Sequence, residues 1–168
     1  NRMGVLSEIG ILARLQSYLD RACECFEQVL AHLPREDGAL RCGTQLELGL
    51  ARLALGENAR AREDIQQASN YARPSISRLA ARRMADWREG DPLSEPPEPA
   101  QECPWVHRPR YFFLMGEFAK FTDRRDEAQR AYHRAYIECA SPWQKNAWLS
   151  VLRLKELGGQ LPADAPDF

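Results

Sequence analysis

The sequence predicts an all-α protein, a solenoid of antiparallel helix pairs, and three observations lead to this prediction. A glycine is followed twelve residues later by an alanine three times, at Gly10 and Ala22, Gly49 and Ala61, and Gly116 and Ala128. A large side chain comes four residues after each alanine, namely Phe26, Ile65 and Tyr132. A proline then closes each unit, namely Pro34, Pro74 and Pro142.

Helix-pair packing explains this pattern physically. We expect each glycine to face its alanine where two helices cross closely, because a larger side chain would push the axes apart. The proline ends the second helix, since the residue before a proline avoids the helical region. One such hairpin cannot bury its apolar face alone, so neighbouring pairs must stack.

The first repeat is predicted at about residues 4–34 and the second at 43–74. Repeat one has a helix over 7–18 and a second over 21–33, for which Asp20 is the expected N-cap. Repeat two has helices over 39–55 and 59–72. Gly56 follows the first of these and is expected to adopt the left-handed conformation that ends many helices.

An orphan helix without a partner is predicted over residues 75–89. A Pro-rich loop follows over 90–109, where six prolines exclude a regular helix. Its large apolar side chain, Trp105, is expected to lodge on the helical surface if the loop is ordered. Rapid proteolysis between Asp91 and Arg108 would instead indicate a free loop.

The third repeat is predicted over residues 110–142, with helices at 110–121 and 126–139. A capping helix is expected at 142–157, with Ser141 as its N-cap and Pro142 at its first position. It would shield the terminal repeat from solvent. Residues 161–168 are interpreted as a tail, so that residues 1–160 form a single domain.

Several positions resemble the tetratricopeptide repeat family. In the second repeat they are Leu48, Gly49, Gly56, Ala61, Ile65, Ala68 and the closing Pro74. In the third they are Phe112, Met115, Gly116, Ala128, Tyr132, Ala135 and Pro142. A weaker copy contains Ile9, Gly10, Ala22, Phe26 and Pro34. The family's early tryptophan is replaced by Leu6, Gln45 and Phe112, and its mid-helix tyrosine by Ala13, Arg52 and Ala119. The resemblance implies a right-handed solenoid.

Composition points away from several function classes. The chain has 24 acidic and 23 basic residues, so it has no overall attraction for nucleic acid or an anionic membrane. No apolar run is long enough to span a bilayer. Five cysteines, an odd number, favour reduced thiols over a disulfide framework. We expect a cytoplasmic protein; a periplasmic or secreted location is the alternative if a signal peptide was removed.

The sequence offers no arrangement for catalysis, and we expect no enzyme activity, no cofactor and no metal. The three histidines do not stand at metal-ligand spacing with cysteines or carboxylates. Cys23 and Cys25 form a CxC pair on a helix, which we interpret as packing. The arginines Arg78, Arg82 and Arg83 form a secondary basic patch that could bind an acidic partner, although a solvated surface is the preferred interpretation.

The resemblance implies a concave groove lined by the first helix of each pair. Transferring the groove offsets of the family gives Ile11, Leu15, Leu46, Leu50, Leu53, Phe113, Glu117, Lys120 and Phe121. The lysines and asparagine with which some members hold a terminal carboxylate are lacking. We expect a scaffold or assembly adaptor that binds a peptide or helix of a partner protein here. The alternatives are a chaperone for an apolar client segment and a regulatory domain of a larger enzyme or transcription factor.

Overall fold

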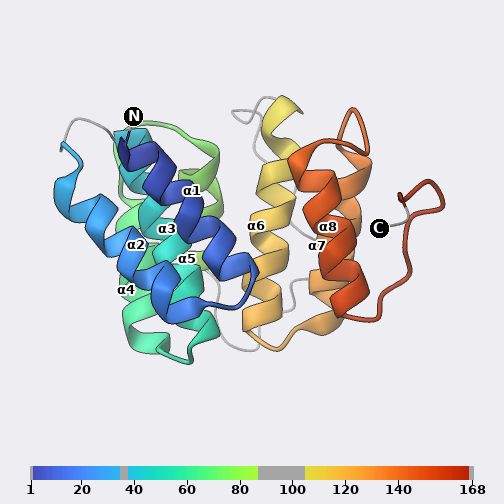
Figure 1. Cartoon of the computed structure of the whole chain (residues 1–168), viewed down its shortest axis with the longest axis horizontal. Coiled ribbons are helices and arrows are strands. Elements are labelled where there is room, and N and C mark those ends of the chain that lie inside the picture. Colours follow the sequence, from blue (N-terminus) through green and yellow to red (C-terminus); the bar gives the residue numbers. More distant parts are fainter. Residues whose placement is uncertain (1, 35–37, 87–104, 167–168) are drawn as a thin grey trace. The chain divides into compact units, whose positions relative to one another are not determined.

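The computed structural model describes residues 2–34, 38–86 and 105–166 (Figure 1). This part of the chain contains eight α-helices, one short 3-10 helix and no β-strand. The all-α prediction is therefore confirmed for the described residues. The chain divides into two compact units, Asn1–Trp87 and Arg88–Phe168, which are described in turn.

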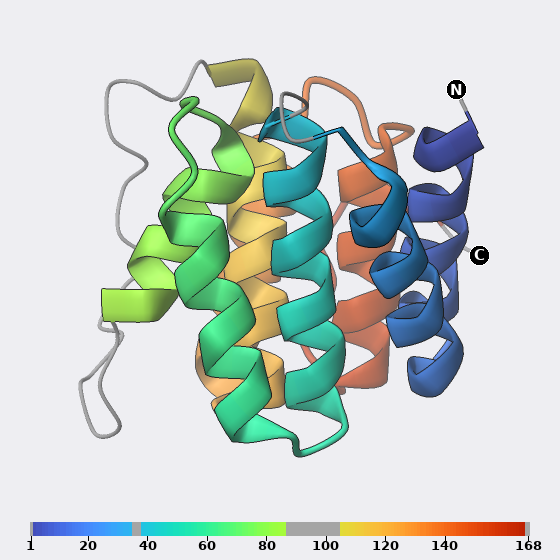
Figure 2. The same cartoon turned by 90° about the vertical axis from the view of Figure 1, so that its left-hand side faces the viewer.

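The first unit consists of five helices that pack on their neighbours in sequence order (Figure 2). They are α1 (Arg2–Leu15), α2 (Leu19–His32), α3 (Gly38–Ala54), α4 (Asn58–Ser69) and α5 (Ile76–Asp86). The tightest associations join α1 to α2 and α3 to α4. These are the pairs that the glycine and alanine spacing predicted.

The second unit has the same pairwise packing. It contains a 3-10 turn (Trp105–His107) and the helices α6 (Arg108–Phe121), α7 (Arg125–Ile137) and α8 (Lys145–Glu156). Helix α6 pairs with α7, which also packs on α8. After α8, Leu161 and Ala165 contact a buried cluster that includes Tyr136 and Val151. The Tyr136 hydroxyl donates a 3.0 Å hydrogen bond to the carbonyl oxygen of Asp164, so this end of the chain is attached to α7.

Helix ends in the first unit differ from the prediction by several residues. Helix α1 begins at Arg2, not at residue 7, and it ends before Ser17, whose φ of 65° interrupts the helical conformation. Asp20 is not the N-cap of α2, because the helix already begins at Leu19. Its carboxylate instead lies in the first turn, where negative charge favours the helix dipole. Gly56 has a φ of 79° directly after α3, which confirms its predicted conformation.

Two prolines lie differently from the prediction. Helix α8 begins at Lys145, three residues after Pro142. The Ser141 hydroxyl accepts a hydrogen bond from the Trp143 amide, so Ser141 closes a turn instead of capping the helix. Conversely, α6 already begins at Arg108 and contains Pro109, both of which were assigned to the loop. A proline is tolerated there because the first-turn amides of a helix have no intrahelical acceptor.

Other predictions fall on parts of the chain outside the description. These are the Pro-rich segment as far as residue 104, the end of the orphan helix, the last two residues of the tail and the side chain of Trp105. The expected docking of Trp105 and the proteolysis result therefore stay predictions.

The repeated glycines do not face only the alanines that the pattern suggested. A methyl group placed on Gly10 or Gly116 would lie 2.6 Å from the aromatic ring of Phe26 or Tyr132, respectively. On Gly49 it would lie 2.9 Å from Cγ1 of Ile65 and 3.2 Å from the backbone oxygen of Ala61. The close contact is thus mainly with the large residue four positions after the alanine. A flat ring or branched side chain fills the space that each glycine leaves.

Replacing Ala128 by leucine should lower the free energy of unfolding by about 1–3 kcal/mol, because Ala128 is fully buried in the second unit. Chemical denaturation would measure the change. Arg130→Leu, at an exposed position of the same helix, is the matched control and should change the free energy of unfolding by less than about 0.5 kcal/mol. Equal stability of the Ala128 variant and the wild type would contradict close packing around this alanine.

Candidate functional site

The nine residues predicted to line a groove differ in their access to solvent. In the first unit Ile11, Leu46, Leu50 and Leu53 are buried, and Leu15 is partly exposed. In the second unit Phe113 and Glu117 are buried, while Lys120 and Phe121 are partly exposed. We call these nine residues the first-helix face. Its role in binding stays a prediction, and Leu15, Lys120 and Phe121 are the members that solvent reaches.

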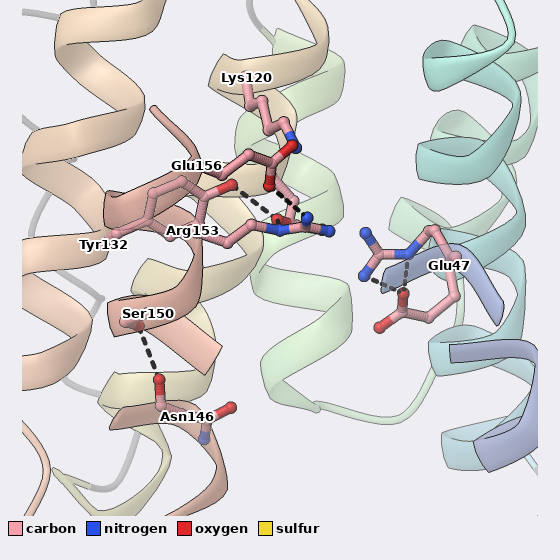
Figure 3. Close-up of polar contacts among 9 residues, drawn as sticks. Glu47, Lys120, Tyr132, Asn146, Ser150, Arg153 and Glu156 are labelled. Atoms are coloured by element: carbon pink, nitrogen blue, oxygen red, sulfur yellow. Dashed lines mark hydrogen bonds and ion pairs between the residues drawn. The ribbon is translucent and has the colours of Figure 1, made fainter. Parts of the chain in front are cut away.

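A buried carboxylate, Glu117 of α6, is the centre of a polar network in the second unit. Figure 3 labels four members of this network, Lys120, Tyr132, Arg153 and Glu156. Its Oε1 accepts a 2.6 Å hydrogen bond from the Tyr132 hydroxyl of α7. The same oxygen accepts a 2.8 Å bond from Nε of Arg153 on α8, whose Nη2 is 3.3 Å from Oε2. Three helices therefore meet at one carboxylate that has no contact with water.

The network continues to the protein surface through Glu156. Nη1 of Arg153 donates to Oε2 of Glu156 at 2.6 Å, and Nζ of Lys120 donates to Oε1 at 2.5 Å. Burial opposes ionisation of Glu156, but the hydrogen bonds from Lys120 and Arg153 outweigh it, so the pKa of this carboxyl lies below its usual value. Burial likewise disfavours the Arg153 cation, but Glu117 more than compensates and raises its pKa. Arg153 and Glu156 are therefore both charged at neutral pH.

A second buried ion pair lies in the first unit. Nε of Arg14 on α1 donates a 2.9 Å hydrogen bond to Oε2 of Glu47 on α3, and Nη2 is 2.8 Å from the same oxygen. The two side chains are 0 and 3 % exposed. The pair links the first helices of two successive helix pairs. Glu47 is labelled in Figure 3.

Arg52 of α3 joins three helices through a further network. Its Nη1 donates to Oδ2 of Asp64 on α4 at 2.7 Å, and its Nη2 donates to Glu27 on α2 at 2.6 Å. The amide of Gln45 donates to Oδ1 of Asp64, also at 2.7 Å. Burial raises the pKa of Asp64, and these hydrogen bonds offset the rise only in part. The network positions helices and does not form an open site.

Sequence reasoning missed most of these polar residues. Glu117 and Lys120 were predicted, but Glu47, Arg153 and Glu156 were not. Arg153 stands 36 residues from Glu117, and no local pattern connects them. One signal was visible: Glu117 occupies the offset from the repeated glycine that is apolar in the other copies, at Ile11 and Leu50. A charge at a position expected to be apolar implies a buried partner.

The three arginines of the predicted basic patch differ in their access to solvent. Arg82 and Arg83 are exposed on α5, whereas Arg78 is partly buried. Nη1 of Arg78 donates a 3.3 Å hydrogen bond to the carbonyl oxygen of Ala72, so this side chain holds the segment before α5. Two exposed arginines remain as the available part of the patch.

The described cysteines are free thiols. They are Cys23, Cys25, Cys42 and Cys139. Burial raises the pKa of the Cys23 thiol to about 11, although the Arg52 cation opposes the rise. Burial also raises the pKa of Cys42 and of Cys139. Because the thiolate is the nucleophilic form, Cys23, Cys42 and Cys139 are poor nucleophiles at neutral pH.

Two absences concern the part of the chain that the structure describes. No group of three or more histidine, cysteine, aspartate or glutamate side chains there is arranged to hold a metal ion. None of the helices there combines the length and the apolar character needed to cross a membrane.

Comparisons with protein-family models, with curated proteins and with solved structures found no match for this chain.

Proposed function

We propose that the chain is a tetratricopeptide-like solenoid that acts as a non-enzymatic protein-interaction module. Three features support this: the repeated glycine offsets, the pairing of α1 with α2, α3 with α4 and α6 with α7, and the stacking of α2 on α3 and of α7 on α8. Stacked helix pairs provide extended surfaces for peptides and helices, and their first helices line the concave side.

The accessible edge of the first-helix face in the second unit carries this proposal. Phe121 is a partly exposed aromatic side chain at the end of α6. Nζ of Lys120 lies 5.5 Å from the centre of its ring. Lys120 is held by Glu156, and Glu156 by the buried Arg153. An aromatic anchor beside charges in fixed positions is typical of the few residues that dominate a protein interface.

The proposed ligand is an extended or helical segment of a partner protein. It would place an apolar side chain on Phe121 and an acidic or amide group near Lys120. Buried ion pairs contribute little net stability, but they fix geometry. The network behind Lys120 would therefore orient a ligand more than it would attract one.

Selection of a displayed library of random peptides on the immobilised chain tests the proposal. Phe121→Ala should weaken the binding of an enriched peptide by about 1–2 kcal/mol, roughly five- to thirtyfold in Kd. Fluorescence anisotropy would measure Kd, and thermal unfolding would verify that the variant stays folded. Arg82→Glu combined with Arg83→Glu is the control, because these arginines lie on the exposed side of α5.

Two outcomes would contradict the proposal. If the Phe121 variant binds the peptide as tightly as the wild type, this edge is not the site. If the two arginines decide the affinity while Phe121 has no effect, the protein is an electrostatic binder that uses α5.

A further inference from the structure

Helix α1 carries a row of exposed apolar side chains. Val5, Ile9 and Leu12 are 61, 46 and 52 % exposed. Their spacing of four and three residues places them on one face of the helix, and we call them the α1 stripe. Single exposed apolar residues are ordinary on protein surfaces, whereas a continuous row along a helix marks an interaction surface.

The α1 stripe has counterparts in both other helices that contain the repeated glycine. Relative to Gly10, Val5 stands five residues before, Ile9 one residue before and Leu12 two residues after. The same offsets from Gly49 and Gly116 give Thr44, Leu48 and Ala51 in α3, and Tyr111, Met115 and Phe118 in α6. All six counterparts are at most 3 % exposed. One face is therefore buried in two helices and open in the third.

In α3 the structure shows what covers this face. Leu48 and Ala51 share a core cluster with Ala22 and Phe26 of α2, and α2 packs along α3. Helix α2 is the second helix of the preceding pair. The α1 stripe is thus suited to the second helix of a further pair, which would present a small and an aromatic residue four positions apart, as α2 does.

Charge adds a second requirement for the partner. Glu47 stands two residues before Gly49, and Arg14 on the first helix of the preceding pair donates to it. Glu8 stands two residues before Gly10 and is exposed. A hairpin that stacked on α1 in the same way would bring a residue in the position of Arg14 close to Glu8. The matching hairpin is therefore apolar on its second helix and basic on its first.

Contact area argues against two copies of the chain meeting through this stripe. A symmetric contact would cover three half-exposed side chains on each copy. A stable interface buries about 800 Å² on each partner.

We propose that the α1 stripe docks a helical hairpin whose second helix is apolar, stacked on α1 as α2 is stacked on α3. This surface is separate from the first-helix face, and the inference does not depend on the function proposed for that face.

A duplication tests the proposal with the chain's own hairpin as the probe. Residues 1–39 are inserted ahead of Asn1, which keeps the spacing of thirty-nine residues that separates Gly10 from Gly49. The added copy of α2 should then cover the α1 stripe. Compared with the unduplicated chain, the amide hydrogens of the original α1 should exchange at least about tenfold more slowly. The midpoint of thermal unfolding should rise.

The matched control carries Ile9→Glu and Leu12→Glu in the original α1 only. In the duplicated chain it should abolish the slower exchange. In the unduplicated chain it should leave the thermal midpoint almost unchanged, because both sites are exposed. If the glutamates unfold the chain, serine at both positions replaces them.

The proposal is overturned if the duplication leaves exchange in α1 unchanged, or if the control variant slows it equally. Sedimentation of the unduplicated chain gives another test. The proposal is also overturned if that chain is a dimer and its variant with Ile9→Glu and Leu12→Glu is a monomer. A second copy would then occupy the stripe.

Discussion

Replacing Arg153 by methionine is expected to lower the free energy of unfolding by about 3–5 kcal/mol. The substitution keeps an unbranched apolar chain of similar length but removes the guanidinium that neutralises Glu117. That carboxylate is completely buried, so it would remain a charge in the protein interior, beside the Tyr132 hydroxyl but without the Arg153 cation. Urea unfolding monitored by circular dichroism would measure the loss.

A double variant separates the loss of the pair from the loss of one partner. Leu50 occupies in α3 the offset that Glu117 occupies in α6, so leucine is an apolar residue already used at this position. Glu117→Leu combined with Arg153→Met should therefore regain most of the stability, because replacing both members of a buried ion pair is often neutral. A double variant no more stable than Arg153→Met alone would show that volume, not charge, determines the loss.

The pH dependence gives an independent readout of the same charge. In the Arg153→Met variant, burial without the Arg153 cation should raise the pKa of Glu117 in the folded state above its unfolded value. The folded state then binds the proton more tightly than the unfolded state. Stability should be highest below the unfolded pKa and should fall as the pH rises through the raised folded pKa. The absence of such a fall would mean that Glu117 finds another cation.

Local periodicity predicted the helices well, because apolar spacing and turn residues act within a few positions of the chain. It placed most helix ends within about three residues of those observed, and the larger error is at the start of α1, which begins at Arg2 and not at residue 7. The family offsets also predicted which residues of α3 and α6 form the first-helix face. They did not predict that Leu50 and Phe113 are completely buried.

Contacts between distant segments could not be predicted in this way. The pairs of Arg14 with Glu47 and of Arg153 with Glu117 join residues more than thirty positions apart. Their formation depends on how helices stack, and no spacing rule within one helix reports it. The glycine pattern showed the same limit. It indicated a close crossing, but Phe26, and not Ala22, supplies the atoms nearest to Gly10.

Two glycines of α1 should respond in opposite directions to alanine. Gly4→Ala should raise the free energy of unfolding by about 0.5–1 kcal/mol, because alanine is the better helix former and nothing lies within 4 Å of the added methyl group. Gly10→Ala gains the same helix propensity, but its methyl group would meet the Phe26 ring at 2.6 Å. We expect a net loss of about 1–3 kcal/mol through overpacking.

A double-mutant cycle assigns this loss to the ring. Phe26 is fully buried on α2, and Phe26→Leu should destabilise the chain by itself because it leaves unfilled space. In that background Gly10→Ala should cost little or become stabilising, because the methyl group enters the vacated space. The coupling between the two sites should then exceed about 1 kcal/mol, as is usual for residues in direct contact. If Gly10→Ala costs the same with phenylalanine and with leucine at position 26, the glycine is needed for the path of the α1 backbone and not for the ring.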